Sequence, residues 1–259
     1  MSADILLVEP QGPVTTLTLN QPATINALSL EMLGRIAAAL DEVAASPARV
    51  VILRAAGRNF CAGHDLREIQ ACRSDPDRGA AAFHSLFALC ARVMQKIAAL
   101  PQPVVAEVQG IATAAGCQLA ATCDMIVAAD TARFGVNGVN IGLFCHTPLV
   151  ALSRKIPPSQ AFELAATGEF ISAARAHGLG LVTRLASDLS LQSETEALAR
   201  ILAQKLPQAL ALGKRAAARD LTAAYATASA AMVENLLSTD TAEGIQAFLD
   251  KRPPKWQSA

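Results

Sequence analysis

The chain has 259 residues, of which 52% are hydrophobic, and its 22 basic and 22 acidic residues leave a formal net charge of zero. This length allows one domain with a large core, and the absence of long basic runs argues against a nucleic-acid partner. No apolar run approaches the ~20 residues of a membrane span, and the first residues lack a signal or transit-peptide pattern, so a cytoplasmic protein is expected.

The cysteines and histidines point to no redox or metal chemistry. The six cysteines form no C-x-x-C pair, and several lie in apolar stretches, so buried reduced thiols are expected. The four histidines are scattered without ligand spacing, so the sequence predicts no metal site.

The first predicted elements are a hairpin, a helix and a strand. Residues 5–9 and 14–19 alternate in hydropathy around the turn Pro10-Gln11-Gly12-Pro13, which predicts a β-hairpin. Ser29 is a suitable cap for the helix that follows, and an uncharged strand is expected at residues 50–53. The apolar stripe predicted for this helix consists of Leu30, Leu33, Ala37, Leu40 and Ala44.

The middle of the chain continues the same alternation. Residues 70–80 carry several charges and a proline, which favours an exposed, mobile loop. A long amphipathic helix is predicted at 81–99, a buried strand at 104–108, a helix of small residues at about 114–122, and a further strand at 125–129. Repeated strand-then-helix units predict an α/β protein. Periodicity alone does not decide how those units are arranged.

From residue 159 onward helical stripes dominate. Only residues 181–183 look extended. Such alanine-rich helices bury little area by themselves, so packing on a neighbouring subunit is expected. The predicted helices are residues 161–166, 173–177, 191–205, 221–237 and 242–249.

Two segments carry a family resemblance. Ala62-Gly63-His64-Asp65-Leu66 follows one buried strand, and the segment from Gly110 to Asp124, rich in Gly, Ala and Thr, follows another. Together with Asn26-Ala27-Leu28, they resemble the enoyl-CoA hydratase/isomerase (crotonase) superfamily from about residue 5 to the C-terminus. Details such as Gly63-His64-Asp65-Leu66 look closest to the subgroup called enoyl-CoA hydratase domain-containing protein 3.

The resemblance implies an architecture and an assembly. It implies a crotonase-like spiral of ββα units over residues 1–195 and a C-terminal helical region over 196–259 that packs a homotrimer or a dimer of trimers. The expected partner is an acyl-CoA thioester. Coenzyme A then arrives as part of the substrate, and no prosthetic group is implied.

The resemblance also implies a site built from main-chain donors. It places the backbone N–H groups of His64 and Ala115 on the thioester oxygen, where an oxyanion develops. Small residues at a strand-to-helix turn suit this close approach, although they also suit plain helix packing. For CoA itself it implies Asn26, Ala27, Leu28, Ala62, Gly63, Asp65 and Leu66. Arg67, Lys214 or another subunit would contact the phosphates, unless these are ordinary surface charges.

The side chains expected for hydration are missing. Hydratases of this superfamily use two glutamates, and the matching positions here are Gln118 and Gly138. An amide does not exchange protons near neutral pH and glycine has no side chain. Each missing acid–base group forfeits roughly 10²–10⁴-fold in rate. Classical hydration is therefore disfavoured.

Other polar residues have two interpretations each. His146 is either a neutral base at a helix N-terminus or a simple cap. Asp65 and Glu68 are either a carboxylate pair or a helix cap and a solvent-facing side chain. Asn137 and Asn140 either hold a ligand or form turns. Cys145 lacks a suitably placed base, and Cys61 and Cys117 are expected in the core.

Three classes of function therefore remain open. The first is an enzyme of the hydratase/isomerase type, a lyase or isomerase, with altered chemistry such as thioester hydrolysis, decarboxylation or isomerisation. The second is a non-catalytic acyl-CoA-binding or scaffold protein. RNA binding, known for one branch of the superfamily, is disfavoured by the neutral charge.

Overall fold

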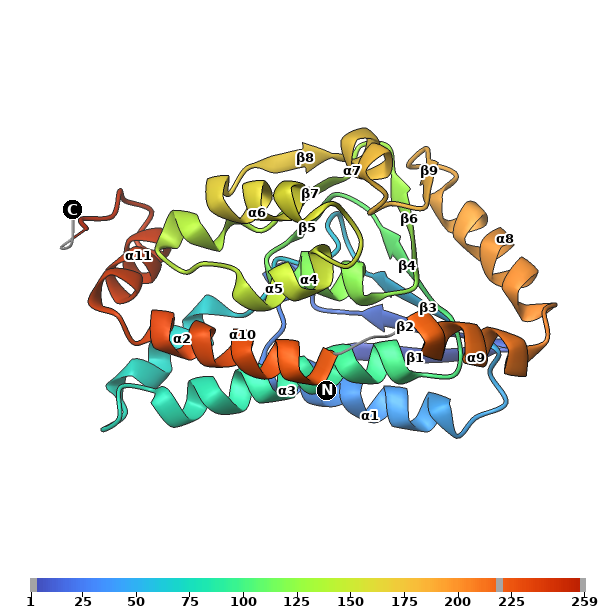
Figure 1. The fold of residues 1–259 in the computed structure, drawn as a ribbon, viewed down its shortest axis with the longest axis horizontal. Coiled ribbons are helices and arrows are strands. Elements are labelled where there is room, and N and C mark those ends of the chain that lie inside the picture. The colour runs from blue at the N-terminus through green and yellow to red at the C-terminus, as the bar shows by residue number, and fades with distance from the viewer. Residues whose placement is uncertain (1–3, 218–220, 257–259) are drawn as a thin grey trace.

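The computed structural model describes residues 4–217 and 221–256. A large sheet runs through the molecule in the order β1-β2-β3-β4-β6-β9 (Figure 1). The β1–β2 pair is antiparallel and the remaining pairs are parallel. Its strands are β1 (Leu6–Gln11), β2 (Val14–Leu19), β3 (Val50–Ala55), β4 (Val104–Val108), β6 (Met125–Ala129) and β9 (Arg184–Ala186).

A second, smaller sheet turns the chain into a spiral. It contains β5 (Ile111–Thr113), β7 (Arg133–Gly135) and β8 (Phe170–Ser172) in that order. Strands β4 and β6 of the large sheet each continue into a strand of the small sheet, and Cys61 after β3 makes an isolated bridge to Ala112. The β4 and β6 turns of the spiral therefore contribute one strand to each sheet before the next helix.

Helices enclose both sheets. Helices α1 (Leu30–Ala44), α3 (Ala80–Ala99) and α10 (Leu221–Leu236) form one layer, in which α3 packs on both of the others (Figure 1). Helix α8 (Leu191–Ala203) covers the other face of the large sheet. The remaining helices are α2 (Leu66–Ala71), α4 (Ala115–Thr122), α5 (His146–Leu152), α6 (Pro158–Thr167), α7 (Ala173–Leu179), α9 (Pro207–Ala217) and α11 (Thr239–Leu249).

Most elements in the first half match the prediction, with local corrections. Ser29 caps α1 by accepting a hydrogen bond from the Met32 N–H at 3.1 Å. The buried stripe of α1 is rotated from the predicted one, because Leu30 and Ala44 are exposed and Ala37 is only half-buried. The buried residues of α1 are Met32, Leu33, Ile36, Ala39, Leu40 and Val43.

Residues 70–80 are not a simple loop. Helix α2 extends to Ala71, a 3-10 turn spans Cys72–Ser74, and α3 begins at Ala80. Asp65 caps α2 by accepting hydrogen bonds from the N–H groups of Arg67 and Glu68. The capping interpretation of Asp65 is therefore confirmed.

The second half contains elements that periodicity did not reveal. Strands β5, β7 and β8 have three residues each, too few to show an alternating pattern. The predicted extended segment 181–183 lies just before β9, because Leu181 and Val182 are buried in the turn after α7 and pairing with β6 begins at Arg184. Helix α9 was not predicted.

The C-terminal helices pack on the rest of the same chain. Helix α10 lies against α3 and α5, and α11 lies against the 3-10 helix η3 (Asn137–Ile141). Gly244 of α11 is so close to η3 that an added Cβ would lie 2.3 Å from the Ile141 carbonyl oxygen. None of the helices in the described segments combines the length and apolar character needed to cross a bilayer.

Candidate active site

The two motif segments meet at the C-terminal ends of β3 and β4. The Thr113 N–H donates a hydrogen bond to the Cys61 carbonyl at 3.0 Å. Gly116 in the first turn of α4 approaches the same carbonyl, since a Cβ added there would lie 2.3 Å from its oxygen. Only glycine allows this approach, so the sequence brings the two loops into direct backbone contact.

The two predicted donors lie on either side of this contact. Gly63 has φ +93°, and a Cβ added there would lie 3.1 Å from the Ala115 nitrogen and 2.9 Å from the Ala114 Cβ. Ala115 is the first residue of α4, so its N–H has no partner within the helix. Among the described residues, neither the His64 nor the Ala115 N–H donates a main-chain hydrogen bond.

Backbone strain sets the orientation of one donor. Ala114 has φ 48° and ψ −124°, a conformation that a residue with a Cβ rarely adopts. Such a residue costs on the order of 1–3 kcal/mol and persists only when its surroundings impose it. The peptide that carries the Ala115 N–H is therefore held in place by the packing of both loops.

Asn26 ties the N-terminal segment to the first loop. Its side-chain amide donates to the carbonyls of Ala56, Asn59 and Phe60 at 3.0–3.1 Å, and its Oδ1 accepts from the Gln21 N–H at 2.9 Å. The Asn26 N–H also donates to the Gln21 carbonyl at 2.9 Å, and its carbonyl accepts from the Cys61 thiol at 3.1 Å. Asn26 therefore fixes the first loop, and its role in binding CoA stays a prediction.

The other residues predicted to contact CoA lie around the same junction. The Leu28 N–H donates to the Gly63 carbonyl at 2.8 Å, and the Ala62 N–H donates to the Ile25 carbonyl at 3.0 Å. Ala27 and Leu28 are buried, whereas Ala62, Asp65 and Leu66 are half-buried. The structure thus brings these positions together beside Gly63.

His64 is a half-buried residue with a neutral imidazole. Its Nδ1 lies 3.2 Å from the Leu28 carbonyl oxygen, its ring packs edge-on against Phe87 at 5.5 Å, and its Nε2 is buried without a hydrogen-bond partner among the described residues. Burial lowers the pKa of His64 to about 4, although the hydrogen bond to Leu28 opposes this shift. The ring is therefore uncharged at neutral pH, with the lone pair of Nε2 free when the proton is on Nδ1.

Gln118 is fully enclosed. Its side chain is 0% exposed, and within the described chain its Oε1 and Nε2 close no hydrogen bond of good geometry, although the Tyr225 hydroxyl interacts with this side chain. Helix α4 places it one turn after Ala115. Two unsatisfied polar atoms in the interior are costly, so this side chain is not explained by packing alone.

Gly138 leaves no space for a side chain. A Cβ at this position would lie 2.3 Å from the Leu143 carbonyl oxygen and 2.9 Å from the Cys145 sulfur. The Leu143 N–H donates to the Gly138 carbonyl at 3.0 Å and closes this turn. The loop at Gly138 is therefore too tightly packed to accept the glutamate that hydratases carry at this position.

His146 is the first residue of α5 and is half-buried. Its Nδ1 lies 2.9 Å from the Phe144 carbonyl oxygen. The Phe144 N–H in turn donates to the Asn235 side chain of α10 at 2.8 Å. When Nδ1 carries the proton, it donates to this carbonyl and Nε2 is left as an acceptor.

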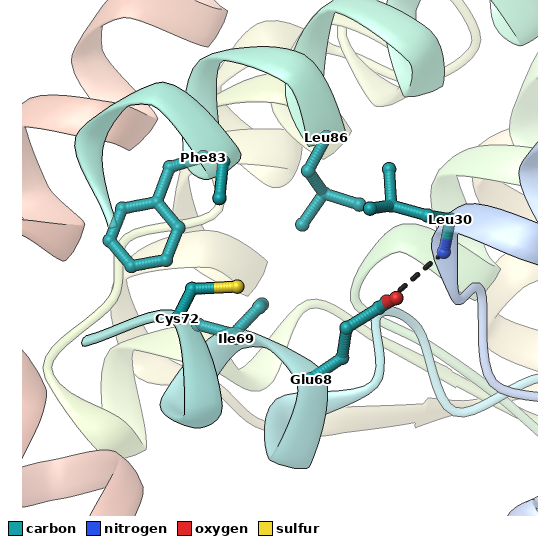
Figure 2. Close-up of a pocket in the computed structure, with 7 residues that line it drawn as sticks. Leu30, Glu68, Ile69, Cys72, Phe83 and Leu86 are labelled. Carbon is teal, nitrogen blue, oxygen red and sulfur yellow. Dashed lines mark hydrogen bonds between the residues drawn. The ribbon is translucent and has the colours of Figure 1, made fainter. Parts of the chain in front are cut away.

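Glu68 was predicted in one interpretation to face solvent; it is partly exposed and also makes a hydrogen bond within the fold. It is half-buried, and its carboxylate accepts a hydrogen bond from the Leu30 N–H at 3.0 Å, across a narrow pocket between α2 and α3 (Figure 2). This bond caps the N-terminus of α1. The pocket is lined by Leu30, Glu68, Ile69, Cys72, Ala82, Phe83 and Leu86.

Lys214 is not available for phosphate contacts. Its ammonium pairs with the Asp124 carboxylate at 2.7 Å and donates to the Gln102 carbonyl at 3.0 Å, at the N-terminal ends of β4 and β6. The lysine side chain is only 8% exposed. Arg67 is exposed beside the start of α2 and stays the predicted phosphate contact within this chain.

The remaining polar candidates make structural contacts. The Thr113 hydroxyl donates to Asn137 Oδ1 at 2.7 Å, and the Asn140 side chain lies beside Gly168. Burial raises the pKa of Cys61 and Cys117 to about 12 and that of Cys145 to about 11. None of these thiols is a ready nucleophile, because the thiolate is the reactive form.

Two residues near the site had no sequence signal. Tyr225 and Asn235 belong to a helix predicted only as part of the C-terminal region, yet Tyr225 reaches Gln118 and Asn235 holds Phe144. Both contacts join residues that are far apart in the sequence, so no local pattern predicts them. In residues 4–217 and 221–256, no three His, Cys, Asp or Glu side chains lie close enough together to hold a metal ion.

Comparisons with known proteins cover nearly the whole chain. The enoyl-CoA hydratase/isomerase family profile matches residues 9–259. Enoyl-CoA hydratase domain-containing protein 3, mitochondrial, from Danio rerio is 41% identical over 99% of this chain and 89% of its own length.

Two solved structures share the fold over almost their full length. The crystal structure of an enoyl-CoA hydratase from Mycobacterium smegmatis has a TM-score of 0.78 at 46% identity, covering 98% of this chain and 99% of that one. The crystal structure of human enoyl-CoA hydratase domain-containing protein 3 has a TM-score of 0.77 at 40% identity, covering 98% and 100%.

Proposed function

This chain belongs to the enoyl-CoA hydratase/isomerase family, with the crotonase fold and the subgroup that its motifs predicted, and on that premise we propose that it binds acyl-CoA thioesters through a main-chain oxyanion hole. The donors in this proposal are the N–H groups of His64 and Ala115. The observation that carries it is the contact between their loops, in which a Cβ on Gly63 would lie 3.1 Å from the Ala115 nitrogen.

The electrostatics of the site support this proposal. The first N–H groups of α4 face the junction with no internal partner, and the helix dipole adds a partial positive charge at its N-terminus. A thioester oxygen that gains negative charge is stabilised by such fixed donors. Loss of one donor typically costs about 3 kcal/mol of transition-state stabilisation.

The proposed chemistry is not classical hydration. Gln118 and Gly138 offer no carboxylate, and His64 is neutral with a pKa of about 4. What the site retains is a means to polarise a thioester carbonyl. We therefore favour an isomerase-, hydrolase- or decarboxylase-type reaction on an acyl-CoA, or binding without turnover, over addition of water to a double bond.

A proline at position 115 tests the donor directly. Proline is well accepted at the first position of a helix and has no N–H, so Ala115→Pro removes one donor while α4 keeps its start. Thr239→Pro is the matched control, because Thr239 is the exposed first residue of α11.

The readout compares butyryl-CoA with free CoA by isothermal titration calorimetry. We expect Ala115→Pro to weaken butyryl-CoA binding by about 2- to 12-fold, the equivalent of one neutral hydrogen bond, and to leave free CoA unaffected because it has no carbonyl at that place. Thr239→Pro should change neither affinity. Equal losses for both ligands, or no binding of butyryl-CoA by the unmodified protein, would contradict the proposal.

A second candidate gives His146 an acid–base role. Its Nδ1 contact with the Phe144 carbonyl at 2.9 Å favours the tautomer with a free Nε2. If a turnover is found for any acyl-CoA, His146→Ala should lower kcat by roughly 10²–10⁴-fold with little change in KM. Unchanged kcat would remove His146 from the mechanism.

Assembly and location complete the proposal. We expect a homotrimer or a dimer of trimers, with residues 196–259 supplying contacts in addition to their packing on residues 1–195. Exposed apolar side chains in this region, such as Leu206, Leu212 and Phe248, support this expectation. Six unpaired cysteines suit a reducing compartment, and we retain the cytoplasm as the expected one. Light scattering and fractionation test these two points.

A further inference from the structure

The corner between α10 and α11 holds the backbone of the loop that leads to His146. Asn235 of α10 is half-buried, and it uses both ends of its side-chain amide. Its Oδ1 accepts from the Phe144 N–H at 2.8 Å, and its Nδ2 donates to the Gly142 carbonyl at 2.9 Å. The Thr241 hydroxyl, in the first turn of α11, donates to the same carbonyl at 2.8 Å. Two successive peptide groups of the loop are therefore fixed by a segment almost 100 residues away in the sequence.

Phe144 in turn holds His146 on two sides. Its carbonyl oxygen lies 2.9 Å from the His146 Nδ1 and accepts from the His146 N–H, also at 2.9 Å. The intervening Cys145 has φ −80° and ψ 66°, the conformation of an inverse γ-turn. The phenyl ring meets the imidazole edge-on, with the ring centroids 4.9 Å apart. The position of Phe144 thus decides where the imidazole lies and which acceptor its Nδ1 meets.

The contacts of residue 235 require an amide in one orientation. If the Asn235 amide were turned over, its NH₂ group would face the Phe144 N–H and its oxygen would face the Gly142 carbonyl. A leucine of similar volume would offer neither a donor nor an acceptor. The chemistry of Asn235 therefore serves the loop before His146 rather than the packing of α10.

A carbonyl at Nδ1 selects one form of a neutral imidazole. The Nδ1–H tautomer of His146 donates to the Phe144 oxygen and leaves the lone pair on Nε2, whereas the other tautomer sets the Nδ1 lone pair against that oxygen. Acceptors placed on one ring nitrogen fix both the tautomer and the orientation of a histidine. A general base needs this control, because its lone pair must point at the proton that it takes.

We propose that Asn235 is a positioning residue for His146: through Phe144 it holds the carbonyl that keeps the proton on Nδ1 and presents Nε2 as the acceptor. This inference rests on the proposed acid–base role of His146. It gives the C-terminal helical region a part in the chemistry of the site, in addition to its packing on the rest of the chain.

The test follows the tautomer of His146 by NMR of the imidazole nitrogens in ¹⁵N-labelled protein. The chain has four histidines, and His146→Ala identifies the signals of His146. At about pH 8.5, above the ordinary pKa range of histidine, we expect the unmodified protein to carry the proton mainly on Nδ1. In Asn235→Leu the ratio of the Nδ1–H form to the Nε2–H form should fall by about 2- to 12-fold, the equivalent of one neutral hydrogen bond.

A matched control separates positioning from a general loss of packing. Gln102 is also a buried amide that holds a loop, because its Nε2 donates to the Val43 and Ala48 carbonyls at 3.1 and 3.2 Å. It lies just before β4, at the opposite end of the sheet. Gln102→Leu and Asn235→Leu should each lower the Tm, by about 2–4 °C for each hydrogen bond lost. Only Asn235→Leu should change the His146 tautomer.

Two milder variants divide the contacts of the corner. Thr241→Val removes a hydrogen bond to Gly142 and leaves the Phe144 N–H bound to Asn235, so it should lower the Tm with little change in the tautomer ratio. Asn235→Asp keeps the shape of the side chain and an acceptor for the Phe144 N–H. It should therefore retain more of the native ratio than Asn235→Leu.

Turnover gives a second readout for any acyl-CoA that the protein converts. Asn235→Leu should lower kcat with little change in KM. It should cause no further loss when combined with His146→Ala, because both substitutions act through one imidazole. Gln102→Leu should change neither kcat nor KM.

The outcomes are distinct. The positioning role of Asn235 is refuted if the unmodified protein carries the His146 proton mainly on Nε2, if Asn235→Leu keeps the native ratio, or if Gln102→Leu shifts the ratio equally. If the ratio shifts as expected but no acyl-CoA binds, or His146→Ala keeps full turnover, Asn235 still positions His146 and the proposed function of the site fails instead.

Discussion

The two ends of the central strands use polar groups in opposite ways. At the N-terminal ends of β4 and β6, the Asp124 carboxylate accepts from the Val104 N–H and pairs with Lys214, both at 2.7 Å. The Lys155 ammonium donates to the Asp124 carbonyl at 3.1 Å. The Lys214 ammonium is thus paired with a carboxylate and the Lys155 ammonium is bound by a main-chain carbonyl, so these contacts hold α9 and the loop after α5 against the sheet.

At the opposite end, beyond β3 and β4, polar groups are buried without partners. The Nε2 of His64 has no hydrogen-bond partner within the described chain, and the Gln118 amide and the Tyr225 hydroxyl close no hydrogen bond of good geometry, although they interact with each other. Each buried polar group left without a hydrogen bond typically lowers the free energy of unfolding by about 1–3 kcal/mol. The comparison indicates that one end is built for stability and the other retains unsatisfied groups that a ligand can complete.

The largest expected effect is a loss of stability when the Asp124 carboxylate is removed from the N-terminal ends of β4 and β6. Asp124→Ala leaves the largely buried Lys214 ammonium without its carboxylate, and removal of one partner of a buried ion pair typically costs about 3–5 kcal/mol. Urea denaturation of the ligand-free protein measures this loss. The control is Asp188→Ala, because Asp188 is exposed and, among the described residues, accepts hydrogen bonds from the Thr131 hydroxyl alone. A loss no greater than the control's would show that the pairing is not a source of stability.

The pH dependence of stability probes His64, at the end of the sheet beyond β3 and β4. The His64 pKa is about 4 in the folded protein, below its ordinary value of 6.5, chiefly because of burial. Between these two values the unfolded chain binds a proton that the folded chain does not. Stability should therefore be unaffected by this group above pH 6.5 and should fall as the pH drops toward 4, by roughly 2–3 kcal/mol in total.

His64→Phe isolates that contribution from other acid-sensitive groups. The difference in unfolding free energy between the two proteins, measured at several pH values, should change only between about pH 6.5 and 4. A difference that stays constant over this range would mean that the His64 imidazole titrates normally in the folded state.

A methyl group at Gly63 tests how closely this residue packs against Ala114 and Ala115. Gly63→Ala forces a Cβ against Ala114 and the Ala115 nitrogen at a positive φ, which should cost about 1–3 kcal/mol of stability and weaken butyryl-CoA binding as the donors separate. Gly34→Ala is the control, since Gly34 lies in α1 with open space around its Cα and alanine is the better helix former. Equal behaviour of the two variants would argue against the close approach.

The smallest expected effect is on hydration activity, when glutamates are placed at positions 118 and 138. Gln118→Glu with Gly138→Glu places both glutamates in the sequence, yet we expect no crotonyl-CoA hydration above the background, because the Gly138 loop has no room for a side chain. Gln118→Glu alone is the comparison. Absorbance of the enoyl thioester follows the reaction. Hydration at the rate of a two-glutamate enzyme would show that the loop opens to accept a side chain.

Sequence by itself determined the strand-then-helix units and the place of the two loops, whereas the spiral arrangement was implied only by the family resemblance. Buried strands at 50–55 and 104–108 are uncharged or nearly so, and Gly63 and Gly116 mark points where only glycine allows the backbone to approach. The lack of both glutamates is likewise plain in the sequence. These features depend on local residue types, so they can be predicted from the sequence.

Only the tertiary structure decided what those positions do. Lys214 is 90 residues from Asp124, and Tyr225 lies more than 100 residues from Gln118, so neither contact leaves a local pattern. The steric limit at Gly138 comes from a carbonyl in the following turn. Whether a buried polar group is satisfied depends on all neighbours in space, which is why charge matching at one end and its absence at the other had to be read from the fold.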